Sequence, residues 1–518
     1  MIKKLLVFLG LTFACVAAFA VITMADTVDI TVESSDGYDA SILADDNYYT
    51  TDYYRTGNVL TVTSDTPMEY LYIMWDSEPG EWTLTVNGSD TTCGTHNYLH
   101  ELVKLPTAST EAKITIQTDH TYVADIYGIA GSIPSWVQDW QDPYDKADVL
   151  VISAHSDDEI LFMGGLIATY VNGGKYRIQV AYLCDLSLTE RYRQHEQLNG
   201  LWAIGIRHYP QLGEFVDDLL EGDIDGTYDL LGGYDKVMEY MVSTIRRFKP
   251  QVVVTHDFEG EYGHPEHQIV AETVADALEV TNDSSRYSES ASQYGTWDVP
   301  KAYFHLYDQN QIELNLRVPL EDFGGRTAVE VATDAYLEHD SQQWMWFYVS
   351  DGYDEDGNVD YSDDRIPTIN CSLFGLYRTT VGNDTGTDIM EHLTSYDVQD
   401  AQAAAQTETT AEPETNEKGE TIETTAAPEP ETDADGQTIE TTAPQPETEK
   451  GGSVIKTILI ILAIIAGLII ILMIVLLIVS SIKKKKEAER RRRRAAQRRK
   501  AQSQSSQSRS QTQSRNKR

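Results

Sequence analysis

Residues 149–160 read VLVISAHSDDEI, an apolar run that leads into a histidine and three acids. A short continuous apolar run bounded by polar residues predicts a fully buried strand. His155, Asp157, Asp158 and Glu159 follow this strand directly. One acidic turn alone is usually solvated, so its meaning depends on what the rest of the chain places beside it.

Strand-like and helix-like segments alternate from residue 148 onward. Apolar runs at 176–185 (YRIQVAYLCD) and 251–257 (QVVVTHD) predict two further strands. Helical spacing is present in 159–174, 191–206 and 234–250. This alternation predicts an α/β domain with a Rossmann-like, mostly parallel sheet covered by helices. Ligands bind such sheets at the carboxyl ends of the strands, where AHSDDE and THD both lie.

Residues 26–135 have a different pattern. Short runs rich in Val, Ile, Thr and Tyr are separated by turn residues, which predicts an all-β sandwich or jelly roll. The runs lie at 42–54, 58–65, 70–76, 81–88 and 112–119. ILADDNYYTTDYY (42–54) and YLYIMWD (70–76) resemble segments of discoidin-like, galactose-binding jelly rolls. The resemblance implies carbohydrate or surface binding, and a structural spacer is the alternative.

Both ends of the chain carry membrane signals. Residues 1–25 combine two lysines, an apolar stretch and small residues, which predicts a signal peptide. Residues 457–482 form an uncharged apolar run long enough for one transmembrane helix. The basic segment 483–518 then predicts a cytoplasmic tail and an ectodomain outside the cell membrane. Residues 399–452 repeat Thr, Glu and Pro, which predicts a disordered stalk.

Charge and cysteine content argue against two classes of protein. The 518 residues carry a formal net charge of −42, although the segment 483–518 contains 16 Lys or Arg and only 2 Glu. The remainder is therefore strongly acidic, which argues against nucleic acid as a partner. Cys15 should leave with the signal peptide, and the other three cysteines are scattered without metal-ligand spacing, so we expect no disulfide framework.

A second motif, THDFEGEYGHPEHQIV at 255–270, also follows a predicted strand. His264 and His267 are three residues apart and Pro265 suits a first helical turn, so both imidazoles should face one side of a helix. Alone, such a pair usually packs or caps a helix. With the histidine–acid cluster at another strand end, it predicts a catalytic Zn²⁺ site, one per chain, with three protein ligands. Iron and cobalt are alternatives for the same donors.

With both motifs in place, residues 146–395 resemble the zinc-dependent de-N-acetylase family that includes N-acetylglucosaminylphosphatidylinositol deacetylases and LmbE-like proteins. The carrying motifs are AHSDDE and YGHPEH. The resemblance implies that His155, Asp158 and His267 are the zinc ligands. It further implies that Asp157 is the general base for the attacking water, and that His264 stabilises the oxyanion and protonates the leaving amine.

The resemblance also suggests roles around the metal site. Tyr262 matches a tyrosine that assists at the oxyanion. Arg193, in RYRQHEQ, and Asp217, in GEFVDD, are candidate substrate contacts. Ser156 stands where the family usually has proline, so we expect a looser turn with the ligand set intact.

These observations predict a membrane-anchored, extracellular zinc-dependent hydrolase that removes N-acetyl groups from N-acetylglucosamine-type sugars or surface glycans. One alternative is a zinc amidase acting on a non-sugar amide, which product analysis would distinguish. The other is a non-catalytic, glycan-binding adhesin in which the β-domain acts, and in which Asp157 would be dispensable.

Overall fold

The run VLVIS forms strand β9 (Val149–Ser153), whose residues are all buried, as expected of a strand covered on both faces. It lies within a six-stranded sheet of order β10-β9-β11-β12-β16-β13. Strands β10, β9, β11 and β12 are parallel, and only β16 runs antiparallel to its neighbours β12 and β13, so the sheet is mostly parallel as predicted. The other strands are β10 (Ile178–Tyr182), β11 (Val252–Thr255), β12 (Lys301–His305), β13 (Gln311–Glu313) and β16 (Leu373–Thr379).

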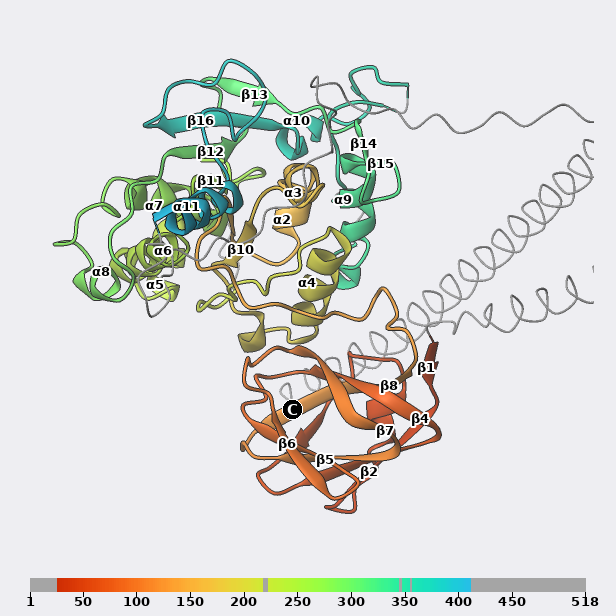
Figure 1. Ribbon diagram of the computed structural model, residues 1–518. Helices are drawn as coiled ribbons and strands as arrows, with labels where there is room; N and C mark the ends of the chain where they lie inside the picture. The colour runs from red at the N-terminus through yellow and green to blue at the C-terminus, as the bar shows by residue number, and fades with distance from the viewer. Residues whose placement is uncertain (1–25, 218–221, 344–346, 355, 411–518) are drawn as a thin grey trace, which may run out of the picture. The chain divides into compact units, whose positions relative to one another are not determined.

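Helices cover both faces of this sheet (Figure 1). Val149 and Val151 pack into one core with the helices α2 (Asp158–Leu161), α3 (Gly164–Val171), α4 (Tyr192–Ala203) and α9 (Ala328–Tyr336). Leu150 and Ile152 pack into the opposite core with α6 (Tyr234–Phe248) and α7 (Pro265–Leu278). Alternate side chains of one strand therefore supply two cores. The smaller elements are η2 (Leu186–Leu188), α5 (Ile224–Leu230), α8 (Ser288–Tyr294), β14 (Pro319–Leu320), β15 (Arg326–Thr327), η3 (Asp340–Gln342) and α10 (Ile366–Ile369).

The predicted helix over 159–174 is instead two helices, α2 and α3, separated at Phe162 and Met163. Tight packing accompanies this break. A Cβ atom on Gly165 would lie 2.3 Å from Leu316 Cδ1. Only glycine, which has no Cβ, therefore allows the start of α3 to lie this close to Leu316.

The N-terminal part is an all-β domain. Its eight strands form one antiparallel sheet of order β1-β8-β4-β7-β5-β6, with β2 beside β4 and β3 beside β8. They are β1 (Asp26–Val28), β2 (Ile30–Ser34), β3 (Asp52–Tyr54), β4 (Val59–Trp75), β5 (Trp82–Val86), β6 (Ser89–Cys93), β7 (His100–Ile116) and β8 (Thr121–Ala130).

The segment 42–54 is not the strand that its tyrosines and threonines predict. It contains most of a 3₁₀ helix, η1 (Ser41–Ala44), then turns, and only its end forms β3. The Asn47 amide N–H donates to Asp125 Oδ2 at 3.1 Å and the Tyr49 N–H donates to Asn47 Oδ1 at 3.3 Å. Side chains of Asn and Asp that bond the backbone compete with the strand ladder, which accounts for the turn.

The computed structural model describes residues 26–217, 222–343, 347–354 and 356–410, which all lie in one compact unit, Met1–Thr410. The predicted signal peptide, transmembrane helix and basic tail, with most of the predicted stalk, lie outside the described residues. Within them, no helix has the length and apolar character needed to cross a bilayer.

The start of the predicted stalk differs from expectation. Helix α11 (Tyr396–Thr410) includes residues 399–410, which were expected to be disordered. This stretch is rich in alanine and glutamine and contains no proline before Pro413, so its helix propensity is high.

Candidate active site

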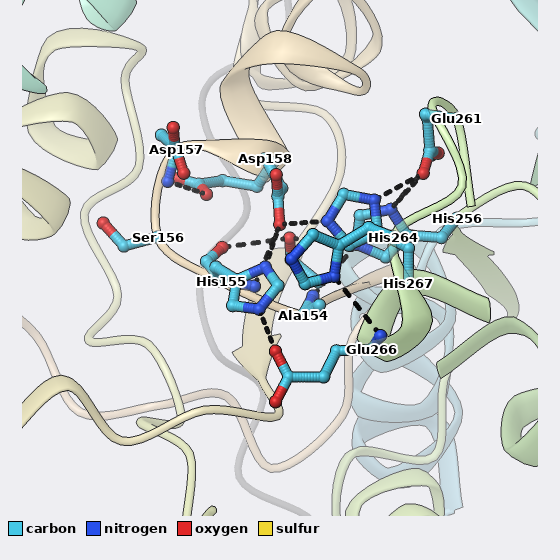
Figure 2. Close-up of polar contacts among 12 residues, drawn as sticks. Ala154, His155, Ser156, Asp157, Asp158, His256, Glu261, His264, Glu266 and His267 are labelled. Atoms are coloured by element: carbon cyan, nitrogen blue, oxygen red, sulfur yellow. Dashed lines mark hydrogen bonds and ion pairs between the residues drawn. The ribbon is translucent and has the colours of Figure 1, made fainter. Parts of the chain in front are cut away.

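The two motifs meet because β9 and β11 are neighbouring parallel strands whose carboxyl ends share one edge of the sheet. His155 and Asp158 follow β9, and His267 lies in the first turns of α7, after the loop from β11. Figure 2 shows their side chains pointing toward one another. Asp158 Oδ2 lies 2.8 Å from His155 Nδ1 and 3.0 Å from His267 Nε2. The structure thus brings the three predicted ligands together.

His264 adds a third imidazole to this cluster. Its ring centroid lies 4.6 Å from those of both His155 and His267, and donor atoms of the three histidines lie within 4.8 Å of one another. His264 is the N-cap of α7, and its Nδ1 accepts a hydrogen bond from the Glu266 backbone N–H at 3.3 Å. Burial and the neighbouring His155 and His267 lower the pKa of His264 to about 2. The ring is therefore neutral, and its proton lies on Nε2.

Asp157 lies beside the ligands in a strained conformation. Its φ of 97° is in the left-handed region, and its amide N–H donates to Glu159 Oε2 at 3.0 Å. Burial, together with the neighbouring Asp158 carboxylate, raises the pKa of Asp157. A carboxyl group whose pKa is raised from the acidic range is better suited to accept a proton near neutral pH.

The two candidate substrate contacts bond to each other. Arg193 donates from Nη1 to Asp217 Oδ2 at 2.7 Å and from Nη2 to the Ser156 carbonyl at 3.0 Å. The turn in which serine replaces the family's proline is therefore held by an arginine. Tyr262 is half exposed, with its ring edge-on to those of His264 and His267, so it lies where the cluster meets solvent.

Two glutamates that the sequence analysis did not single out hold the histidine ligands. Glu261 accepts a hydrogen bond from His267 Nδ1 at 2.7 Å, and Glu266 accepts one from His155 Nε2 (Figure 2). Carboxylates placed on the second nitrogen of an imidazole fix the orientation of a metal-ligating histidine. Glu266 lies within the motif YGHPEH, so the sequence could have indicated its role beside the ligands. Glu261 lies outside the motif, and nothing in the sequence indicated its role.

Two further residues near the cluster were missed. His256 follows β11 in THD as His155 follows β9, so the same signal pointed to it. Its Nε2 accepts the Ala154 amide N–H at 2.9 Å. Cys184, whose spacing suggested no ligand role, lies with His155 and Glu266 in a group able to hold a metal. The three described cysteines are buried and free, as expected of a chain without a disulfide framework.

The predicted ligands fit a zinc ion. His267 Nε2 is buried and, among the described residues, faces only the Asp158 carboxylate, 3.0 Å away. Ligand atoms about 2.1 Å from a tetrahedral zinc lie roughly 3.4 Å apart. The separations of 2.8 and 3.0 Å at Asp158 Oδ2 need only a small expansion to reach that value. Histidine nitrogen and carboxylate oxygen are also the donors that zinc accepts.

The fold and the cluster define a doubly wound α/β domain with a buried histidine–carboxylate site at the carboxyl ends of its parallel strands. Residues 150–278 match the family model described as PIG-L, GlcNAc-PI de-N-acetylase. The domain that contains them belongs to this de-N-acetylase family, which confirms the resemblance.

Individual relatives are similar to part of the chain. A 1D-myo-inositol 2-acetamido-2-deoxy-alpha-D-glucopyranoside deacetylase 1 from Catenulispora acidiphila is 26% identical over 36% of this chain and 64% of its own. A mycothiol S-conjugate amidase from Streptomyces coelicolor is 29% identical over 31% of this chain and 61% of its own. The chain thus spans less than two thirds of either relative. The N,N'-diacetylchitobiose deacetylase structure from Pyrococcus horikoshii is 16% identical, with 40% of this chain and 75% of that chain covered and a TM-score of 0.29.

Proposed function

We propose that the protein is a zinc-dependent N-deacetylase that hydrolyses the acetamide of an N-acetylglucosamine-type sugar or surface glycan. The observation that carries this proposal is that His155 and His267 both approach one carboxylate oxygen of Asp158. Asp157 and His264 lie beside these three residues. The deacetylase and amidase names of the relatives support amide hydrolysis as the reaction class.

Each residue's task follows from its chemistry. When bound by His155, Asp158 and His267, zinc supplies a Lewis acid that polarises the amide carbonyl and acidifies a water molecule. Asp157 takes a proton from the attacking water. The Nε2–H of neutral His264 donates a hydrogen bond to the developing oxyanion, and Tyr262 adds a hydroxyl at the solvent side.

The leaving nitrogen needs one proton to depart as an amine. The family resemblance gives this step to His264, whereas burial favours the neutral imidazole. Asp157, which has just taken the water's proton, is the alternative donor. Arg193 and Asp217 form the polar wall next to Asp157, where they would contact sugar hydroxyls.

We further propose that the enzyme is anchored in the cell membrane by residues 457–482, with residues 26–410 outside and the basic tail in the cytoplasm. The uncharged run and the basic residues after it support this topology. The β-domain would then bind glycan near the catalytic domain. Deletion of 457–518 should release the protein from the membrane fraction, and its retention would contradict the anchor.

The test of the activity measures metal content and acetate release from N-acetylglucosamine oligomers by the full-length protein. We expect about one zinc per chain. Asp157→Asn should abolish acetate release with zinc retained, and His267→Ala should lose both. Activity that survives in Asp157→Asn would overturn the assignment of the base.

A second candidate is amidase activity on a non-sugar amide, which the name of the Streptomyces coelicolor relative favours. Zinc binding without acetate release from any N-acetylated sugar, together with cleavage of a mycothiol S-conjugate, would replace the first proposal with this one.

A further inference from the structure

Helix α4 presents different side chains to its two neighbours. Tyr192, His195, Glu196 and Asn199 have the i, i+3, i+4, i+7 spacing that forms one face of a helix. Arg193 lies at the edge of this face: it is three residues from Glu196, but only two from His195, so its side chain is directed away from that of His195. Arg193 reaches Ser156, Asp157 and Asp217 in the candidate active site. The face that includes His195 contacts the β-domain.

The contact between α4 and the β-domain is polar and buried. His195 Nδ1 lies 2.8 Å from His100 Nε2, and the other nitrogen of His100 lies 2.8 Å from the Tyr72 hydroxyl. The Tyr49 hydroxyl donates to the Glu196 carboxylate. His100 and His195 are fully buried. Loss of the His100–His195 hydrogen bond would leave a buried nitrogen unsatisfied, whereas Glu196 also accepts from the N–H and hydroxyl of Ser341 and would keep those bonds without Tyr49.

The first turn of α4 also packs on the β-domain. No side chain caps its N-terminus, where the Arg193 and Gln194 N–H groups donate to the carbonyls of Glu190 and Arg191. The Arg191 guanidinium lies 4.2 Å from the centre of the Tyr122 ring, and the Tyr192 ring lies 5.1 Å from that of Tyr49. Both aromatic partners belong to the β-domain.

The apolar core is also continuous across the junction. Tyr98 and Leu99 of the β-domain and Tyr209 of the α/β domain are members of one buried cluster. The Tyr98 and Tyr209 rings stack at 4.6 Å, and the Leu99 amide N–H donates to the Tyr209 hydroxyl at 3.1 Å. The β-domain is thus packed against the catalytic domain rather than merely tethered to it.

We propose that the β-domain positions the candidate active site, by holding the first turns of α4 so that Arg193 keeps its contacts with Asp157 and Asp217. Tyr49, His100 and His195 are then positioning residues that act through Arg193. The positioning of Arg193 is a role for the β-domain beyond glycan binding. The effect of this positioning on kinetics rests on the proposed deacetylase activity.

Tyr49→Phe is the sharpest test, because it removes the hydroxyl that bonds Glu196 and keeps the ring that packs on Tyr192. Its matched control is Tyr53→Phe, whose hydroxyl bonds His120 within the β-domain at 3.1 Å. In the full-length protein, Tyr49→Phe should lower kcat/KM about 3- to 10-fold, mainly through KM, the effect of one hydrogen bond. Bound zinc should be unchanged, and Tyr53→Phe should match the parent.

Two readouts separate positioning from general destabilisation. Amide hydrogen exchange over residues 192–197 should accelerate in Tyr49→Phe and not in Tyr53→Phe. In an Arg193→Ala background, Tyr49→Phe should change kcat/KM less than about 2-fold, because residues that act through one another are not additive. Unchanged exchange, or effects that multiply, would overturn the proposal. If the parent releases no acetate, the deacetylase proposal fails, while hydrogen exchange still decides this one.

Discussion

Glu261 is the acceptor for three imidazoles at once. His267 Nδ1, His305 Nδ1 and His256 Nδ1 lie 2.7, 3.0 and 3.1 Å from its carboxylate oxygens. In Glu261→Gln one oxygen would become an NH₂ group that faces imidazole N–H donors. His267 would then lose its fixed orientation, and zinc affinity should fall about 10- to 100-fold. Competition with a chelator measures this.

The control for that variant is Glu259→Gln, in the same loop but exposed. Its zinc affinity should equal that of the parent. Equal affinities in the two variants would show that Glu261 does not orient the ligand.

Asp157 combines a buried carboxyl with a φ of 97°, a region that costs a non-glycine residue about 1–3 kcal/mol. Asp157→Ala removes the carboxyl group and keeps this strain, whereas Asp157→Gly removes both. Both variants should lose acetate release. The glycine variant should nevertheless be more stable than the alanine variant by about 1 kcal/mol, since its greater freedom when unfolded offsets part of the gain. Denaturant unfolding of both proteins measures the difference, and a less stable glycine variant would refute stored strain.

How far the site could be predicted depends on which residues set its geometry. His155, Asp158 and His267 follow two adjacent parallel strands, so a strand pattern and a rule about strand ends suffice to bring them together. Glu261 arrives by a loop that doubles back through positive φ at Gly260, Glu261 and Gly263. Nothing in the spacing of those residues encodes that direction, because it is set by tertiary contacts with the histidines.

Helices and strands could be predicted where burial gives the apolar residues a regular spacing along the sequence. β9, β10, β11, α4 and α6 lie within the predicted ranges because each buries a continuous run or one helical face. The segment 42–54 was mistaken for a strand because β-propensity ignores side-chain bonds such as that between Asn47 and Asp125. The division of 159–174 into α2 and α3 likewise accompanies the close approach of Gly165 to Leu316, which periodicity does not report.

Arg246 on α6 holds the connection between α7 and α8. Fully buried, it donates hydrogen bonds to a hydroxyl and to five carbonyls of that connection, those of Val280, Thr281, Asp283, Arg286 and Tyr287. A lysine has only three donors and cannot satisfy them. Arg246→Lys should therefore lower the free energy of unfolding by about 2–4 kcal/mol.

Arg247→Lys is the matched control for Arg246→Lys. Arg247 follows on the same helix and donates a hydrogen bond to Gln211 Oε1 at 3.1 Å. Its replacement should cost less than about 1 kcal/mol by chemical denaturation. Similar losses in the two variants would contradict a special role for Arg246.

Over the whole described unit, the site concentrates carboxyl groups inside the protein. Asp157, Asp158, Glu159, Glu261 and Glu266 are all buried within or next to the histidine cluster. A cation that binds only the folded state stabilises it by mass action, by about 2.7 kcal/mol at a hundredfold excess over Kd. Chelation should therefore lower Tm by about 3 °C for a cooperative unit of this size, and added Zn²⁺ should restore it.

This stabilisation should extend to the β-domain. Because one buried cluster runs through Tyr98, Leu99 and Tyr209, the two domains should unfold in a single transition that moves as a whole when metal is removed. Tyrosine and tryptophan fluorescence of both domains, followed during heating with and without chelator, measures this. His267→Ala should melt at the same temperature in both conditions, because it lacks a ligand. Two separate transitions, with only the later residues sensitive to chelator, would show that the domains are energetically independent and that the shared core does not couple them.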